Sequence, residues 1–389
     1  MSKVFHFYIP LTKSRVTLRY LRANIFKMKY AVPVLLLLLS SCVNQQQPAA
    51  PAEGTSAAAD SLRYPDEKHL KNVRQLTFGG DNAEAYFSFS GDKLVYQYAS
   101  KNAGVPCDQI YYGSTASSNF EPSLISTGKG RTTCSYFLPG DSLVLYASTH
   151  PAADTCPQNP FMKDVKAYVW PLFDGYEIFV ADLKGNIKSQ LTKNDFYDAE
   201  ATVSPAGDKI VFTSTRSGDI ELYTMNLDGS DVKQITHDLG YDGGAFFSPD
   251  GSKLVFRASR PKTEDEIKNY KDLLSKGLVA PTDMELFVCN ADGSGMKQVT
   301  HLGKANWAPF FHPSGNKIIF CSNHRSEKGF PFHLYMINVD GTGLEQITSD
   351  LMFDSFPMFS PDGKQLVFCS NRNNGGTRDT NIFLAEWVE

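Results

Sequence analysis

The sequence lacks the short motifs that mark the commonest catalytic sites. It contains no Gly-x-Ser-x-Gly pentad, no His-Glu-x-x-His pair and no Gly-x-x-x-x-Gly-Lys loop. These motifs carry the nucleophile of α/β-hydrolases, the zinc ligands of metallopeptidases and the phosphate cradle of nucleotide-binding proteins. A Cys-x-x-Cys pair is absent as well, which argues against a structural zinc site. The sequence therefore favours a non-catalytic protein.

An excess of basic residues is also absent. Lys and Arg total 38 against 42 Asp and Glu in a chain of 389 residues, for a net charge of −4. Binding to nucleic acid through phosphates needs a basic surface, so we expect no nucleic-acid partner. Hydrophobic residues make up 42% and charged residues 21%, which is typical of a folded globular chain.

Acidic residues are missing from the first 41 positions, which carry seven basic ones. An apolar run over 31–39 follows and ends in Leu39-Ser40-Ser41-Cys42. This order predicts a signal peptide over 1–41, with Met28 as an alternative start. The tetrad resembles the lipobox of bacterial lipoproteins, which implies lipidation of Cys42 and a periplasm-facing anchor in the outer membrane. Residues 42–70, rich in Gln, Pro, Ala and Ser, are expected to form a flexible tether.

One pattern recurs six times after the tether. Its clearest turn is Phe359-Ser360-Pro361-Asp362-Gly363-Lys364, with related turns at 87–92, 137–141, 203–208, 247–252 and 311–316. Pro, Asp and Gly in this order favour a tight turn, and the β-branched run that follows each turn predicts a strand. A third strand with an aliphatic-aromatic pair and a fourth strand with Gln-aliphatic-Thr complete each repeat.

Four strands per repeat match the blades of a propeller. The chain opens with a fourth-strand copy, Gln75-Leu76-Thr77, and ends on a third strand at 381–387. The first strand can therefore complete the last blade and remove the exposed edges. We predict an all-β fold over 71–389: a six-bladed β-propeller of four-stranded antiparallel blades, closed by the N-terminal strand, with one short inserted helix.

The turn, the Gln-aliphatic-Thr strand and the segment from Leu222 to Gly229 resemble the repeats of TolB-like six-bladed propellers. The resemblance covers the repeats as a whole, more closely in blades three to six than in the first two. It implies a periplasmic scaffold that binds other envelope proteins. Apart from the resemblance, we expect a monomer that binds an envelope protein or peptide and requires no cofactor.

Two repeats are longer than the others because of insertions at 150–175 and 261–283. In the second, Thr263 and Glu266 form a capping box. An apolar stripe follows it at Ile267, Tyr270, Leu273, Leu274 and Leu278. This pattern predicts a helix whose apolar stripe packs on the propeller or, alternatively, in a groove of a partner. The first insertion carries Tyr168 and Trp170, which are either contact residues for a partner or part of a lid folded onto its own blade.

The seven cysteines divide by position in the repeat. Cys289, Cys321 and Cys369 fall in strands and are interpreted as small buried side chains. Cys107 and Cys156 fall in equivalent loops of adjacent blades, which predicts a disulfide in an oxidising compartment.

Two rows of aligned positions at the start of the innermost strands are candidate binding residues. The first row includes Asn82, Asp198, Asp242, Asn306 and Asp354, and Glu84 and Glu200 lie two residues further along their strands. We expect the first row to ring the channel mouth, with the two glutamates just inside. Asp198, Asp242 and Asp354 could then hold calcium, which prefers oxygen ligands, or a cationic group of a partner.

Two classes of function remain open. The first is a non-catalytic scaffold that binds a protein, peptide or small ligand at the channel face. The alternative is a hydrolase or lyase that uses the channel, related to the propellers of prolyl-oligopeptidase-type peptidases without their catalytic domain.

The lipobox leads to a first prediction. Cys42→Ser removes the acylated side chain, so the protein should move from the membrane fraction to the soluble fraction. Fractionation of cells followed by immunoblotting measures this, with Cys289→Ser as a control that should stay with the membrane. A Cys42→Ser protein that stays in the membrane at the wild-type level would contradict lipidation at this residue.

Overall fold

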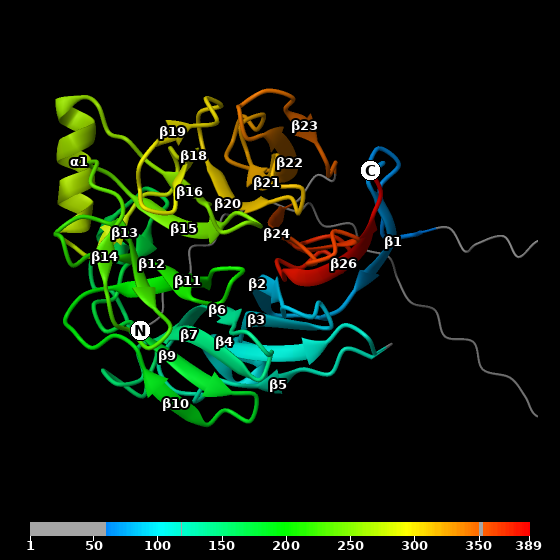
Figure 1. Ribbon diagram of the computed structural model, residues 1–389, viewed down its shortest axis with the longest axis horizontal. Coiled ribbons are helices and arrows are strands. Elements are labelled where there is room, and N and C mark those ends of the chain that lie inside the picture. The colour runs from blue at the N-terminus through cyan, green and yellow to red at the C-terminus, as the bar shows by residue number, and fades with distance from the viewer. Residues whose placement is uncertain (1–59, 118, 350–352) are drawn as a thin grey trace, which may run out of the picture. The chain divides into compact units, whose positions relative to one another are not determined.

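Six four-stranded antiparallel sheets form the fold in this computed structural model, which describes residues 60–117, 119–349 and 353–389 (Figure 1). The predicted six-bladed propeller is therefore confirmed. Blade 1 is β2 (Asp81–Phe87), β3 (Lys93–Ser100), β4 (Val105–Ser114) and β5 (Ser123–Leu124). Blade 2 is β6 (Thr132–Phe137), β7 (Leu143–Ser148), β9 (Glu177–Asp182) and β10 (Ile187–Gln190). Blade 3 is β11 (Asp198–Val203), β12 (Lys209–Ser214), β13 (Glu221–Asn226) and β14 (Lys233–Gln234).

The remaining blades repeat this plan. Blade 4 is β15 (Asp242–Phe247), β16 (Lys253–Ala258), β18 (Glu285–Asn290) and β19 (Lys297–Gln298). Blade 5 is β20 (Asn306–Phe311), β21 (Lys317–Ser322), β22 (His333–Asn338) and β23 (Glu345–Gln346). Blade 6 is β24 (Asp354–Phe359), β25 (Gln365–Ser370), β26 (Asn381–Trp387) and β1 (Leu70–Gln75).

The ring closes in two ways. The innermost strands β2, β6, β11, β15, β20 and β24 each contact the next, and β24 contacts β2 (Figure 1). At the outer edge of blade 6, β1 pairs with β26 from Leu70 opposite Trp387 to Gln75 opposite Phe383. The predicted completion of the last blade by the N-terminal strand is thus confirmed.

The Gln-aliphatic-Thr signature has a hydrogen-bonding cause. In blade 3 the Thr236 hydroxyl accepts the backbone N–H of Leu222 at 2.8 Å, and the Gln234 side chain donates to the carbonyl of Thr236 at 2.8 Å. The equivalent hydroxyl bond recurs in the other blades, from Ser126, Thr192, Thr300, Thr348 and Thr77. Each hydroxyl satisfies a buried donor of the third strand where the short fourth strand ends.

The folded part begins earlier than predicted. The flexible tether was expected to reach residue 70, but Glu67 is fully buried and pairs with Arg372 at 2.8 Å. Asp60 also accepts the backbone N–H of Val73 at 3.1 Å. The polar composition of this segment suggested that it is solvated. The sequence gives no local sign of the burial, because Arg372, which pairs with Glu67, lies near the other end of the chain. The predicted signal peptide, Cys42 and the first part of the tether lie outside the described residues.

The two insertions meet. Helix α1 (Glu264–Leu274) begins with the predicted Thr263–Glu266 capping box and buries Tyr270 and Leu273, so the predicted packing on the propeller is confirmed. After the helix, β17 (Leu278–Val279) pairs with β8 (Trp170–Pro171) of the first insertion. We call this two-stranded sheet, which joins blades 2 and 4, the lid. None of the helices in the described ranges is long and apolar enough to span a membrane.

A disulfide fixes the first insertion. Cys107 and Cys156 are bonded, with 5.9 Å between their Cα atoms, and link β4 of blade 1 to the insertion of blade 2. Cys107 lies within β4 rather than in a loop. The other cysteines of the described ranges, Cys134, Cys289, Cys321 and Cys369, are free and buried.

Removal of this cross-link should destabilise the protein. The bond closes a loop across a sequence separation of 49 residues, so Cys107→Ser with Cys156→Ser should lower the free energy of unfolding by about 3–4 kcal/mol. Urea denaturation measures the loss, and wild-type protein in which this bond is reduced should show a loss of similar size. A thiol count on denatured Cys42→Ser protein should give four free thiols before reduction. Reactivity of Cys107 and Cys156 in that count would contradict the pairing.

Candidate functional site

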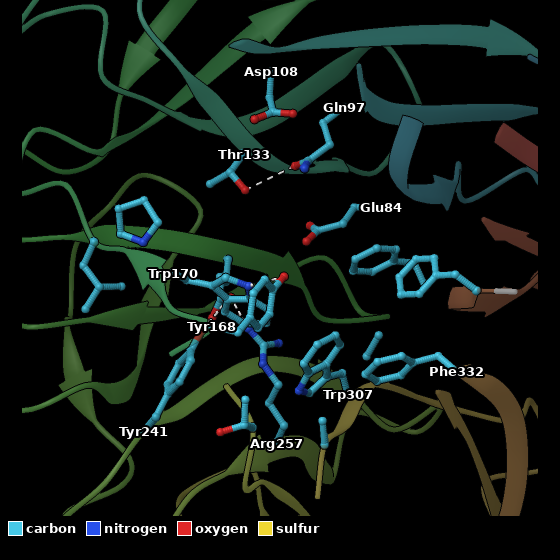
Figure 2. Close-up of a pocket in the computed structure, with 18 of the residues that line it drawn as sticks. Glu84, Gln97, Asp108, Thr133, Tyr168, Trp170, Tyr241, Arg257, Trp307 and Phe332 are labelled. Carbon is cyan, nitrogen blue, oxygen red and sulfur yellow. Dashed lines mark hydrogen bonds and ion pairs between the residues drawn. The ribbon is translucent and has the colours of Figure 1, made fainter. Parts of the chain in front are cut away.

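A cavity of about 570 Å³ opens on the face of the ring that carries the lid. Its lining comes from the beginning of several innermost strands, from the lid and from loops of blades 5 and 6. Figure 2 shows two different walls, which carry respectively Gln97, Asp108 and Thr133, and Trp170, Trp307 and Phe332. The size is that of a pocket for a small molecule or a few side chains.

Six equivalent residues, one from each innermost strand, line a small space of about 20 Å³ in the channel, and we call this row the floor. Four of them, Glu84, Glu200, Ala308 and Phe356, also line the larger cavity. Each of the six has a positive φ, from 41° to 61°, at the point where pairing with the second strand shifts register. A bulge of this kind redirects a side chain, and here it turns the whole row toward this small space. The row is Glu84, Cys134, Glu200, Gly244, Ala308 and Phe356. Glu84 and Glu200 thus lie inside the mouth, where the sequence placed them.

Glu200 is held by four donors. Its Oε2 accepts from the Thr213 hydroxyl at 2.8 Å and from the backbone N–H of Gly244 at 2.9 Å. Its Oε1 accepts from the Tyr241 hydroxyl at 3.0 Å and forms an ion pair with Arg257. Both charged side chains are buried. Such a pair is fixed in place, because a charge without its partner would be costly in this environment.

Gly244 makes room for this ion pair. A Cβ at this position would lie 1.8 Å from Nη1 of Arg257, so any side chain here would displace the guanidinium from Glu200. The positive φ of 61° is also readily adopted by glycine. The floor therefore has a glycine where Arg257 crosses it.

Glu84 stands apart from the other floor carboxylate. Among the described residues no lysine, arginine or histidine lies within ion-pair distance of it, and its hydrogen-bond partners are the Tyr86 hydroxyl at 3.5 Å and the Cys134 thiol. Burial, and secondarily the charge of Glu200, raises the pKa of Glu84 to about 7 against the lowering effects of Cys134 and Arg257. The cavity floor therefore holds a carboxyl group that titrates near neutral pH.

The lid supplies an aromatic wall. The Trp170 ring lies 5.2 Å from that of Trp307, and the Trp307 ring stacks on Phe332 at 4.5 Å. Trp307 donates its indole N–H to the carbonyl of Pro281 at 2.8 Å, while the guanidinium of Arg257 lies 5.5 Å from the Trp170 ring. The lid therefore packs across the channel onto blade 5 and does not fold onto its own blade alone. Tyr168, which is 59% exposed, stands at the rim.

The opposite wall is polar. Arg131 pairs with Asp108 at 2.7 Å, and the Thr133 hydroxyl donates to the Gln97 side chain at 3.2 Å. Burial raises the pKa of Asp108, and Arg131 opposes that shift. A ligand in the cavity would therefore meet hydrogen-bonding groups on one side and aromatic rings on the other (Figure 2).

The predicted ring of polar groups at the channel mouth is wrong. Asp198, Asp242 and Asp354 are fully buried. Each pairs with the arginine eighteen residues further along the chain. These pairs are Asp198–Arg216 at 2.8 Å, Asp242–Arg260 at 2.7 Å and Asp354–Arg372 at 3.2 Å. In the described ranges no three His, Cys, Asp or Glu side chains are grouped to hold a metal ion, so the structure contradicts a shared calcium site at these aspartates.

The amide members of the same row join neighbouring blades. Asn82 donates to the carbonyl of Thr380 at 2.8 Å, and Asn306 donates to the carbonyl of Met284 at 2.8 Å. Both carbonyls belong to the preceding blade next to its third strand. The row is polar because these positions satisfy buried groups between blades, not because they face the channel.

Two neighbouring acidic side chains lie between blades 3 and 4. Glu221 and Asp242 are both buried, and burial raises the pKa of each. The Oε2 atom of Glu221 and the Oδ2 atom of Asp242 have no donor among the described residues. A proton on Glu221 supplies the missing donor, because Arg260 already neutralises Asp242.

Several cavity residues escaped the sequence prediction. Arg257, Trp307 and Phe332 were not singled out, nor was the Asp108–Arg131 pair. One signal was available for two of the lining residues: the fifth residue of each second strand reads Gln97, Ala147, Thr213, Arg257, Cys321 and Cys369. A charged or amide residue at this place interrupts an otherwise apolar strand, which marks Gln97 and Arg257 as side chains that face the channel.

Comparisons with known proteins agree with this architecture. Residues 172–278 match the family PD40, described as the TolB beta propeller domain. No curated protein matches the sequence. Among solved structures, one assigned to TolB from Agrobacterium tumefaciens is 18% identical, with a TM-score of 0.52, and the match covers 82% of this chain and 97% of that one. TolB from Acinetobacter baumannii is 17% identical with a TM-score of 0.51, over 78% of this chain and 65% of that one.

A third similar structure is an oligogalacturonate lyase from Vibrio parahaemolyticus. It is 13% identical with a TM-score of 0.47, and the match covers 80% of this chain and 79% of that one. The family match, the TolB structures and the six blades show a TolB-like propeller. At these identities the structural likeness concerns the fold and not the activity.

The Glu221–Asp242 pair makes stability depend on pH. The pKa of Glu221 is raised above its ordinary 4.5 in the folded state, so the folded state binds more protons than the unfolded state above that pH. Stability should therefore fall as the pH rises from about 5 to 8. Glu221→Gln keeps a donor at every pH and should stabilise the protein at pH 8 by on the order of 1–2 kcal/mol, with little effect at pH 5.

Urea denaturation at the two pH values measures this difference. The exposed Glu386 offers a matched control, because Glu386→Gln should leave the pH profile unchanged. A Glu221→Gln protein whose stability falls between pH 5 and pH 8 as steeply as that of the wild type would show that this pair does not share a proton.

Proposed function

We propose that this protein is a non-catalytic lipoprotein of the bacterial envelope whose central cavity binds an exposed peptide segment of another envelope protein. The cavity carries the proposal, because it joins an open mouth, an aromatic wall and a polar wall in one space of about 570 Å³. Aromatic and arginine side chains in a concave site are the usual anchors of recognition.

The fixed floor favours binding over catalysis. Glu200 and Arg257 are the most strongly held charged groups in the cavity, and each satisfies the other. A general acid, general base or nucleophile needs freedom to exchange a proton or to form a bond with the substrate. Groups that are already paired position other side chains instead.

The polar wall suits a peptide backbone. Gln97 and Thr133 present amide and hydroxyl groups, while the Asp108–Arg131 pair adds a donor and an acceptor at the same wall. An extended segment exposes unpaired backbone N–H and C=O groups along its length, which such a wall can satisfy. The lid then covers the segment from the aromatic side.

A second candidate rests on one observation. Glu84 has a pKa of about 7, raised mainly by burial, and a carboxyl group that titrates near the working pH can act as a general base. This residue favours a hydrolase or lyase in the channel. Turnover of envelope peptides or oligosaccharides that is lost in Glu84→Gln would establish it, and binding without turnover would support the scaffold.

The location follows from the N-terminal pattern. We infer that acylation of Cys42 holds the propeller at the outer membrane on the periplasmic side. The Cys107–Cys156 disulfide supports an oxidising compartment, since such bonds persist outside the cytosol. Within that compartment the cavity would meet periplasmic segments of membrane and secreted proteins.

Photo-crosslinking in cells tests the proposed cavity. A benzoylphenylalanine probe at Tyr168, on the rim, should capture a discrete envelope protein. The same probe at Ile187, which is 41% exposed on the outermost strand β10, should not capture it. Thr133→Tyr adds bulk inside the cavity and should abolish capture at Tyr168. Thr127→Tyr, at a half-buried threonine outside the cavity, should not.

Two results would contradict the proposal. Equal capture from Tyr168 and Ile187 would mean that the rim is no preferred contact. Capture at Tyr168 that persists in Thr133→Tyr, with an unchanged melting temperature, would place the contact on the outer surface and not in the cavity.

A further inference from the structure

Some of the ionisable side chains that line the cavity form ion pairs with each other, and others do not. The ionisable residues are Glu84, Asp108, Arg131, Glu200, Arg257 and Lys328, apart from the tyrosines. Asp108 pairs with Arg131, and Glu200 pairs with Arg257. Lys328 lies in an exposed loop at the rim. The floor is therefore left with one carboxylate, Glu84, that has no cationic partner in the described part of the chain.

The surroundings of Glu84 cannot supply that partner. Cys134, Glu200 and Arg257 approach it from blades 2, 3 and 4, with Tyr86 on its own strand and Asp108 further away. Blades 5 and 6 contribute Ala308 and Phe356, which carry no charge. Arg257 is the nearest cation, but its guanidinium is committed to Glu200 and Tyr241. An incoming cation would therefore gain a charge partner that the protein does not provide.

The aromatic wall lines the same cavity as this carboxylate. Figure 2 shows Glu84 pointing into the cavity, with Trp307 and Phe332 on the opposite side. These two rings stack on each other and line the cavity with the small part of their surface that stays exposed, 6% for Trp307 and 2% for Phe332. An alkyl chain can pack on such rings while its charged end reaches further, and ring faces also attract cations.

We propose that the cavity selects a cationic group, in the form of a lysine or arginine side chain of the bound segment, which pairs with Glu84 while its alkyl stem packs against Trp307 and Phe332. This inference rests on the proposed function and names the chemistry of its ligand. A neutral sugar would use the same rings and polar wall but would gain nothing from the charge of Glu84. An acidic side chain would be repelled from the floor.

The pH dependence of binding follows from the same contact. The pKa of Glu84 is raised to about 7, chiefly by burial, so this carboxyl is mostly ionised at pH 8 and mostly neutral at pH 6. A lysine side chain stays protonated at both values. Binding of a cationic side chain should therefore weaken as the pH falls from 8 to 6.

Two short peptides that differ by one charge test the inference. Calorimetric titration at pH 8 would use acetyl-Gly-Lys-Gly-amide and its norleucine counterpart, which has the same stem without the ammonium. The lysine peptide should bind the wild type at least ten-fold more tightly than it binds Glu84→Gln. The norleucine peptide should bind both proteins equally and more weakly. At pH 6 the advantage of the wild type for the lysine peptide should shrink.

The controls separate the possible outcomes. Glu121→Gln, at an exposed glutamate away from the cavity, should bind the lysine peptide as the wild type does, and melting temperatures of all variants should agree. Three results would contradict the proposal of a cationic ligand. They are equal affinity of the two peptides for the wild type, equal affinity of the lysine peptide for wild type and Glu84→Gln, and no binding of the lysine peptide. If the probe at Tyr168 still captures a protein, and Thr133→Tyr still abolishes that capture, the proposed function of the cavity would stand even when the cationic ligand is contradicted.

Discussion

Closure of the ring is the constraint on which the rest of this structure depends. Each sheet can bury both faces only if it has a neighbour on each side, and the sixth blade gains its neighbour only when β24 meets β2. Its outermost strand comes from the other end of the folded chain, through the pairing of β1 with β26. The buried contact of Glu67 with Arg372 adds a second tie at the same seam. The cavity exists because this closure holds six innermost strands around one axis.

The repeated bulge then decides which residues reach that axis. In each innermost strand one residue has a positive φ, and five of the six are not glycine. Such a conformation costs on the order of 1 kcal/mol or more for an ordinary residue, and closure of the ring supplies the packing that maintains it. The bulge turns Glu84 and Glu200 inward while the residues two places earlier, such as Asp198, stay between blades. The backbone conformation therefore decides which position of each innermost strand faces the channel. The residue type at that position in each blade then decides which chemical groups the channel contains.

The fold could be predicted almost completely from the sequence, because its signals are local and repeated. Three of these signals depend on hydrogen bonds between residues close in the sequence or in the repeat. They are the Pro-Asp-Gly turn, the Gln-aliphatic-Thr strand and the Thr263 capping box. The site could be predicted only in part, because its determinants are not local. The partner of Asp198 is Arg216 across a strand pair, and the partner of Trp170 is Trp307 in another blade. A polar row in an alignment shows that a position needs hydrogen bonds, but it does not show whether water, a ligand or a neighbouring blade provides them.

The lid makes two insertions that are far apart in the sequence depend on each other. Each of its two strands, β8 and β17, has the other as its sheet partner in the described structure, and Leu278 and Val279 are buried by that arrangement. A chain with only the blade 4 insertion would expose this apolar pair, and one with only the blade 2 insertion would leave Trp170 without its strand partner. The two insertions are separated by more than a whole blade in sequence, yet their strands pair with each other. The two insertions therefore act as one structural unit, in which each supplies the strand that completes the other.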